Sequence, residues 1–275
     1  MKKTIVFAML IVIMTAASPV SAQTIVKGNI VNERGERVEY VSIGIEGDSI
    51  GTISDSIGNF IINIPVTCKS NLVFTHVSHE KTTIPYETYA KGQNLKVTLK
   101  EKEYELTEVV IGKDNLPKKI AGRNIPGPTV SLRGKGKLDA LECGPVFKSK
   151  KDYVISDILL TVKGCSYQWC VLSFNIYEIQ DDEFVNILNK PIYQRIEKSE
   201  DKQRIDIRPD ETIILKKKKK YYISVAVVDS DNYGILDMQS QFKKSYARNI
   251  AKGKIRKLPI GPAIVVKGHE IEQQP

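Results

Sequence analysis

The chain has 275 residues, of which 41% are hydrophobic, and its 41 Lys+Arg against 32 Asp+Glu give a net charge of +9. The residues after position 22 are enough for one large domain or, more commonly, two of ordinary size. No stretch among them reaches about 18 apolar residues, which excludes a membrane-spanning helix from that part of the chain.

The first 22 residues have the pattern of a secretory signal peptide. Two lysines precede an apolar run, and small residues follow it up to Ala22. The apolar run is too short to span a membrane. We therefore expect residues 1–22 to be removed, so that the mature chain starts at Gln23 and lies in the periplasm or at the outer membrane or cell surface. There is no cysteine at the cleavage site to carry a lipid anchor.

Charge divides the rest of the chain into two parts. Residues 23–110 contain 9 Lys+Arg and 12 Asp+Glu, whereas residues 111–275 contain 30 and 20. In an exported protein we expect such a basic surface to be solvated, with an anionic glycan or membrane surface as the alternative and no nucleic-acid partner. The lysine run Lys216–Lys220 is interpreted as a charged β-turn, and the alternative is again an anionic partner.

The apolar residues predict an all-β fold. They recur mostly at alternate positions, in short runs interrupted about every ten residues by Gly, Asn, Asp or Pro, and no amphipathic helix stands out. In the first part we expect strands at 25–31, 40–45, 60–64, 72–77, 95–99 and 106–111. In the second part we expect them at 153–162, 171–179, 192–196, 204–207, 212–215, 221–228 and 264–266.

These predicted strands indicate two β domains, at residues 23–111 and 129–275. Between them, residues 112–128 contain three prolines and no periodicity, which indicates a linker. The segment "LSFNIYEI" in the second domain shows the alternation clearly. One face of this strand should pack in a core, and the other should meet water or a ligand. The packing face has Leu172, Phe174 and Ile176, and the other has Ser173, Asn175 and Tyr177.

The segment "GDSIG" at 47–51 matches the Gly-x-Ser-x-Gly pattern of serine hydrolases, with Ser49 as the nucleophile. That pattern needs a helix after the serine, but a glycine-rich β sequence follows here. The three histidines, at positions 76, 79 and 269, offer no Asp-x-x-His partner. We therefore interpret the segment as a tight turn and expect no catalytic residue.

The motif "HVSH" contains His76 and His79, which raises the question of a zinc site. In a continuous strand, residues three apart point to opposite faces. The two histidines can therefore bind one ion only if the strand breaks between them. We expect neither a metal site nor a cofactor.

The chain has four cysteines and no Cys-x-x-Cys motif. Cys165 and Cys170 each border a predicted strand and are separated by "SYQW", so we predict a disulfide that closes this loop, with buried free thiols as the alternative. Tyr167 and Trp169 in the same loop are candidate ligand contacts for a glycan, since aromatic faces stack on sugar rings. Ordinary packing of these rings is the alternative.

Four segments near the N-terminus carry a family resemblance: "VKGNIVNERGERVEYVSIGIEG", "GTISDSIGNFIINIP", "LVFTHVSHEKTTIP" and "LKVTLKEKEYELTEVVIG". Together they resemble the carboxypeptidase regulatory-like domain, a small prealbumin-like, Ig-like β-sandwich. His76 and His79 stand where the family pattern commonly has an aromatic residue. The resemblance implies a structural role for the residues that match the family's turn motif, which are Gly51, Thr52, Asp55, Gly58 and Phe60.

The chain resembles the stand-alone exported proteins that join this domain to a second, jelly-roll-like β-sandwich. The resemblance implies no peptidase site. We therefore expect an exported, non-enzymatic binding or scaffolding protein of the bacterial cell envelope, with an envelope protein as its partner. The alternative is a carbohydrate-binding accessory module that uses the C-terminal sandwich.

Overall fold

The computed structural model describes residues 22–48, 50–91, 94–104, 116–123, 127–134, 141–181, 183–251 and 255–271. Almost all secondary structure in these ranges is β, which confirms the predicted all-β class. The helix seen there, α2 (Tyr86–Tyr89), has one turn. Within the described residues no helix is long and apolar enough to cross a membrane.

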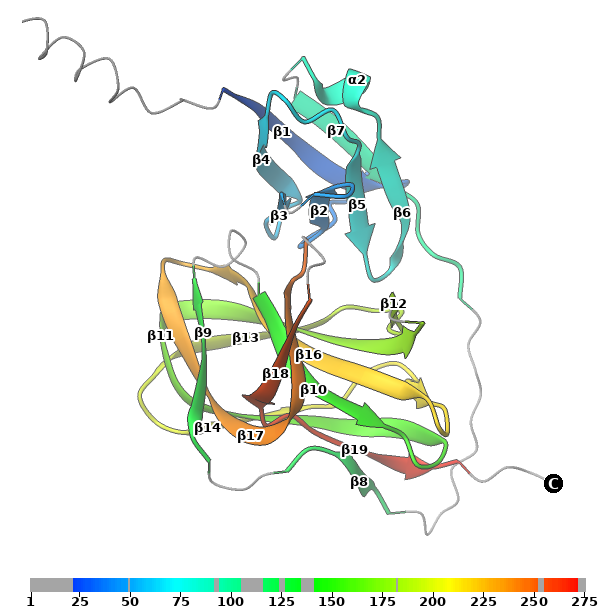
Figure 1. The fold of residues 1–275 in the computed structure, drawn as a ribbon, viewed down its shortest axis with the longest axis vertical. Coiled ribbons are helices and arrows are strands. Elements are labelled where there is room, and N and C mark those ends of the chain that lie inside the picture. The colour runs from blue at the N-terminus through cyan, green and yellow to red at the C-terminus, as the bar shows by residue number, and fades with distance from the viewer. Residues whose placement is uncertain are drawn as a thin grey trace, which may run out of the picture.

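The described part of the first domain forms two sheets packed face to face (Figure 1). One has the order β4-β1-β7, in which β1 runs antiparallel to β4 and parallel to β7. The other has the order β3-β2-β5-β6. The strands are β1 (Gln23–Asn32), β2 (Ser42–Ile45), β3 (Gly51–Ile53), β4 (Asn59–Pro65), β5 (Leu72–His76), β6 (His79–Ile84) and β7 (Asn94–Leu99).

The core of this sandwich lies between the sheets because strand side chains alternate in direction. In β4, Phe60, Ile62 and Ile64 are buried, while the residues between them are exposed. The Phe60 ring meets Phe74 of the opposite sheet edge to face, with centroids 5.5 Å apart. The predicted sandwich is thus confirmed for this domain.

The second domain is one continuous sheet that curves around its own core. Its main order is β18-β17-β10-β16-β11-β19-β8, with further strands on β11 and β17. The strands are β8 (Lys118–Ala121), β9 (Thr129–Gly134), β10 (Leu141–Lys148), β11 (Tyr153–Gln180), β12 (Glu183–Asn186), β13 (Ile192–Ser199), β14 (Gln203–Ile207), β15 (Ile214–Leu215), β16 (Lys220–Ser230), β17 (Gly234–Asn249), β18 (Ile255–Pro262) and β19 (Val265–Glu270).

Strand β11 organises this domain. Its 28 residues pair along one edge with β15, β14, β13 and β12, and along the other with β19, β17 and β16. A straight strand of that length would span about 90 Å. Irregularities in register at 155–157, 162–164 and 165–169 allow it to bend.

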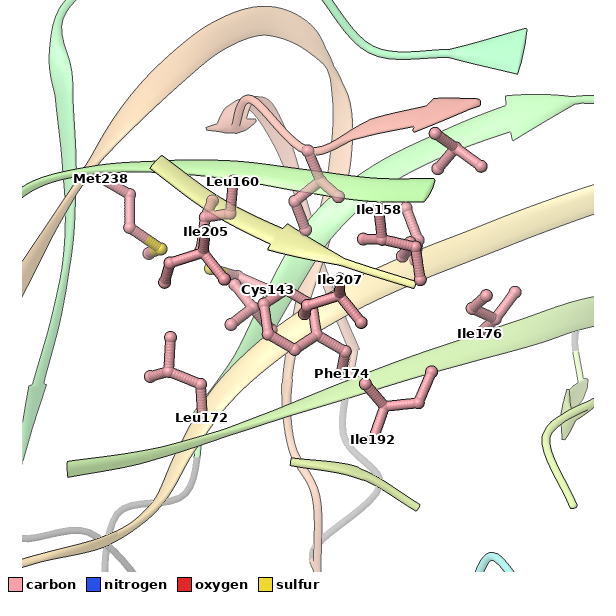
Figure 2. Packing of buried hydrophobic residues seen from close by; sticks show 14 of the residues in the cluster. Cys143, Ile158, Leu160, Leu172, Phe174, Ile176, Ile192, Ile205, Ile207 and Met238 are labelled. Atoms are coloured by element: carbon pink, nitrogen blue, oxygen red, sulfur yellow. The ribbon is translucent and has the colours of Figure 1, made fainter. Parts of the chain in front are cut away.

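Bending lets β11 contribute side chains to both sides of one core. Leu172, Phe174 and Ile176 have no exposed surface and pack with residues of β13 and β14. Figure 2 shows Phe174 next to Ile207 and Ile192, with Leu172 and Ile176 on either side of it. The predicted packing face of "LSFNIYEI" is confirmed.

Two sequence predictions were wrong in this domain. The strands expected at 153–162 and 171–179 are parts of β11, so the segment 165–170 is strand and not loop. Residues 118–121, expected in the linker, form β8 and pair with β19. The first error arises because polar and glycine residues at the bulges of β11 interrupt the apolar alternation from which strands are predicted. The second arises because the edge strand β8 is polar and shows no such alternation.

Other strands were not predicted, namely β3, β6, β9, β10, β12, β17 and β18. Strand β17 is the longest of these, and its "QSQFKKSYARN" segment is too polar to be recognised as buried. The strand predicted at 106–111 and residues 1–21 of the predicted signal peptide lie outside the described residues.

Candidate functional site

The two domains meet through an apolar cluster. Ile53 of the first domain packs with Val171, Ala226 and Val228 of the second. All four are nearly inaccessible to solvent. Partly buried side chains surround them, which are Tyr40, Trp169, Tyr193 and Ile250. Burial of this apolar surface stabilises one arrangement of the two domains.

A pair of glycines allows the backbones to approach closely beside this cluster. Gly44 and Gly51 lie opposite each other in the β2–β3 hairpin. A Cβ at Gly44 would lie 2.5 Å from the carbonyl oxygen of Ala251, and one at Gly51 would lie 2.6 Å from the Ala251 Cβ. Ala251 belongs to the second domain, just after the end of β17. Its backbone can approach the β2–β3 hairpin this closely because Gly44 and Gly51 have no side chain.

Tyr40 forms the third part of the contact. Its φ of +50° is uncommon for a residue other than glycine. Its ring meets that of Tyr193 edge to face, with centroids 4.9 Å apart, and its hydroxyl donates to Asp229 Oδ2 at 3.4 Å. This strained conformation therefore directs the Tyr40 side chain onto the second domain.

Next to these contacts lies a cleft of about 320 Å³, which we call the interdomain cleft. Figure 1 shows the β5–β6 hairpin directed towards the second domain at this place. The first domain contributes Tyr40, Ser42, Ile53, Thr75, His76, Val77 and Lys102. The second contributes Ser173, Asn175, Tyr177, Phe184, Asn186, Pro191, Tyr193, Val228, Arg248 and Ile250.

Alternate residues of β11 supply part of the cleft lining. Ser173, Asn175 and Tyr177 line the cleft and lie outside the main core, although Ser173 and Tyr177 are themselves buried. That this face of "LSFNIYEI" meets a ligand stays a prediction. Asn186 Nδ2 donates to Asn175 Oδ1 at 2.9 Å, and Asn175 Nδ2 lies 3.3 Å from Ser173 Oγ. These amides are held in fixed orientations by one another.

A buried ion pair supports the same wall. Arg248 Nε donates to Oε1 of Glu142, which has no exposed surface, and the guanidinium carbon lies 4.4 Å from the centre of the Tyr177 ring. Ser224 Oγ and the Tyr177 hydroxyl donate to Glu142 Oε2 at 2.6 and 3.2 Å. The carboxylate is thus satisfied, and its charge offsets that of Arg248.

The turn between β5 and β6 brings the two histidines together. His76 Nδ1 and His79 Nδ1 lie 3.0 Å apart, and Ser78 Oγ is 3.0 and 3.1 Å from them. The strand does break between these residues, so their side chains meet. At this separation one ring nitrogen must donate and the other accept. No group of three or more metal-binding side chains occurs among the described residues.

Burial keeps this histidine pair neutral. Desolvation, with smaller contributions from His79 and Lys102, lowers the pKa of His76 to about 3. Burial also lowers the pKa of His79, although Glu101 opposes the shift. A neutral imidazole of such low pKa is a poor general base at neutral pH. The pair is therefore suited to hydrogen bonding.

Tyr167 is not available as a ligand contact. Only 2% of it is exposed, and its hydroxyl donates to the Gly134 carbonyl at 3.1 Å. Trp169 is half-buried in the interdomain cluster, with the Arg195 guanidinium carbon 4.4 Å from its ring centre. Both rings are thus packed, because the expected exposed loop is part of β11.

The predicted disulfide is absent from the structure. Cys165 and Cys170 are buried free thiols with their Sγ atoms 3.9 Å apart, about twice the length of a disulfide bond. The prediction placed the right residues together but assumed a loop. Within β11, the register irregularity after Cys165 brings the two sulfurs to the same side.

The residues of the family turn motif adopt a structured turn. Asp55 Oδ1 accepts from the backbone N–H groups of Ile57 and Asn59, at 3.1 and 2.8 Å. Gly58 has a φ of +75°, and a Cβ there would lie 2.6 Å from the Ile30 carbonyl oxygen. Gly51 allows the close approach of Ala251 from the second domain. Thr52 and Phe60 are buried.

Two further sequence motifs are turns. The segment "GDSIG" joins β2 to β3, although Ser49 itself lies outside the described residues. In the lysine run, the N–H of Lys219 donates to the carbonyl of Lys216 at 3.3 Å, and the Lys218 N–H donates to the Ser149 carbonyl at 2.9 Å. The charged β-turn is therefore confirmed for Lys216–Lys220.

Comparison with known proteins identifies the family of the first domain, which forms one wall of the interdomain cleft. Residues 26–111 match the sequence model of the CarboxypepD_reg-like domain family. This segment is a CarboxypepD_reg-like domain. The domain is of a regulatory, non-catalytic type. No curated protein matches the chain.

The CarboxypepD_reg-like domain contributes Tyr40, Ile53 and His76 to the cleft, and the family match ends before the second domain begins. The other wall, with Asn186 and Arg248, lies outside the matched segment. Sequence reasoning missed these residues because they lie on strands too short or too polar to be recognised.

The close approach of Ala251 predicts that Gly44→Ala will weaken domain docking. The new Cβ at position 44 would lie against backbone atoms of Ala251 and Ile50, which cannot move aside as a flexible side chain can. The substitution should therefore lower the unfolding free energy by about 1–3 kcal/mol. Chemical denaturation and small-angle scattering would measure this. Gly164→Ala is the matched control, since its Cβ would meet only one atom, at 3.7 Å. Equal effects of the two variants would contradict the docking role.

The lowered pKa of His76 predicts an acid-sensitive fold. As pH falls below the ordinary histidine value of about 6.5, the unfolded chain binds a proton that the folded chain does not bind until about pH 3. Stability should therefore fall by up to about 1.4 kcal/mol per pH unit in this window. Thermal unfolding of wild type and His76→Asn would test it, and parallel pH profiles would rule it out.

Proposed function

We propose that the protein is an exported, non-enzymatic binding or scaffolding protein of the bacterial cell envelope, and that its partner docks at the interdomain cleft. The signal-peptide pattern of residues 1–22 supports export. The observation that carries the proposal is that both domains line one polar cleft while an apolar cluster holds them together. Ligand sites occur preferentially at such domain interfaces.

The chemistry of the cleft supports binding over catalysis. None of the described residues that line it is an Asp, Glu or Cys. Its histidine is neutral and weakly basic, and Arg248 is engaged by Glu142. Lys102 Nζ donates to the Val77 carbonyl at 2.9 Å. What remains are aromatic rings, amides, hydroxyl groups and apolar side chains. These groups recognise a partner by shape and hydrogen bonds, and they offer no proton-transfer pair for a reaction.

A photo-crosslinking residue placed at Asn186 in the cleft should capture an envelope protein from intact cells. The same residue at Asn63, which is exposed on the outer face of β4, is the matched control. We expect a discrete adduct from Asn186 alone, identified by mass spectrometry. Equal adducts from both positions, or none from Asn186, would count against the cleft as the docking site.

Carbohydrate binding in the cleft is a second candidate function. The observation that favours it is the hydrogen-bonded row Asn186, Asn175 and Ser173 beside the Tyr40–Tyr193 ring pair. Sugar sites combine amide hydrogen bonds with aromatic faces in this way.

If a glycan is the ligand, Asn175→Ala should weaken its binding about tenfold, because a hydrogen bond to the ligand and the support of Asn186 are lost together. Calorimetry with a glycan found by array screening would measure this, with Asn63→Ala as the control. A glycan that binds Asn175→Ala as tightly as wild type would place the sugar elsewhere.

A further inference from the structure

The second domain carries another cavity, of about 590 Å³, which we call the basic groove. It is built on β8, β19, β11 and β14. In Figure 1, β8 and β19 lie on the side of the second domain away from the first domain. Its lining residues are Lys119, Arg123, Leu159, Thr161, Arg204, Ala263, Val265 and Lys267. Half of these side chains are cationic, and none is acidic.

The strand register places like charges together. Lys267 of β19 lies directly opposite Lys119 of β8. Across the neighbouring strands, Arg204 lies opposite Thr161. Like charges at directly opposite positions destabilise an antiparallel pair. Such an arrangement is unfavourable for the free protein, and an anion bound between the two ammonium groups would relieve it.

Three of the four cations have no ion pair with a described residue. Arg204 is partly balanced by Asp206, at 3.3 Å, but no such contact is formed by Lys119, Arg123 or Lys267. Asp157, opposite Lys267 in register, is paired with Arg208 at 3.5 Å.

Lys243 adds to the basic character near the groove. Burial, and to a smaller extent the charge of Arg123, lowers the pKa of Lys243. The basic groove therefore has a surplus of positive charge, which Asp206 and Asp157 offset only in part because Asp157 is also paired with Arg208.

The floor of the groove strengthens its field. Thr161, Ala263 and Val265 are buried, and Leu159 is half-buried. A concave site with cations at its rim and a low-dielectric floor concentrates positive potential where a ligand would lie. The Thr161 position also brings one hydroxyl group to the floor. The cavity has the size of a small ligand site, within the usual range of about 300–1,000 Å³.

We propose that the basic groove binds a phosphate-bearing ligand. A phosphate monoester carries a charge of about −1.5 to −2 and three acceptor oxygens, which match several converging cations better than a single carboxylate does. Arg123 can hold two oxygens with its planar guanidinium, while Lys119 and Lys267 act as point charges. The groove is separate from the interdomain cleft, and the two sites share only strand β11.

The test uses the purified protein, inorganic pyrophosphate as the soluble probe, and phosphatidylcholine vesicles with or without phosphatidic acid. Lys119→Gln/Lys267→Gln should weaken binding by about tenfold or more. The matched control, Lys216→Gln/Lys217→Gln, removes the same charge from the lysine turn and should change binding little. Pyrophosphate binding alone indicates a soluble phosphate, and retention only on phosphatidic acid vesicles indicates a lipid headgroup.

Stability gives an independent readout. Without ligand, the thermal midpoint of Lys119→Gln/Lys267→Gln should equal or exceed that of wild type, because a repulsive pair is removed. Pyrophosphate should raise the midpoint of wild type and not that of the variant. Absence of binding to both probes, or equal loss in the control variant, would overturn the proposal.

Discussion

A strand in the middle of a sheet must satisfy its backbone N–H and C=O groups along both edges. Strand β11 meets this requirement over 28 residues by pairing with seven other strands. Its bends turn one strand into parts of several surfaces. Residues 159 and 161 line the basic groove, residue 171 lies in the domain contact, and residues 173, 175 and 177 line the cleft. A register slip in β11 would therefore disturb all of these together.

The CarboxypepD_reg-like domain is a wall of the candidate site and not a separate appendage. Its turn motif has two structural consequences. Asp55 and Gly58 shape the turn itself, while Gly51, with Gly44, leaves room for Ala251 of the second domain. Gly51 is also the last residue of "GDSIG", so that hydrolase-like segment contributes to docking through this glycine. The hairpin next to it brings His76 to the cleft in a neutral state.

The two cavities differ in how their charges are balanced. In the interdomain cleft, Arg248 is paired with the buried Glu142, and aromatic rings cover its guanidinium. That pair is costly to desolvate but satisfied, so it fixes the wall. In the basic groove, Lys119 and Lys267 face each other, and the carboxylate opposite Lys267, Asp157, is paired with Arg208. The charge of Arg248 thus stabilises the wall of the cleft, whereas the two lysines of the basic groove are left to bind an anion, as proposed above.

The all-β class, the first sandwich and the two faces of "LSFNIYEI" were determined by the sequence alone, because period-two alternation is a local property of strands. The sequence also indicated that His76 and His79 would meet only if the strand broke between them. Only the tertiary structure decided that it does break, that Tyr167 is buried, and that residues 165–170 continue a strand. Asn186, Arg248 and Lys119 come from short or polar strands with no pattern of their own, whereas Lys267 directly follows the predicted strand 264–266. The proximity of these residues to their partners depends on long-range pairing. Contacts between residues far apart in the chain carry no local signal, so both candidate sites emerged only from the fold.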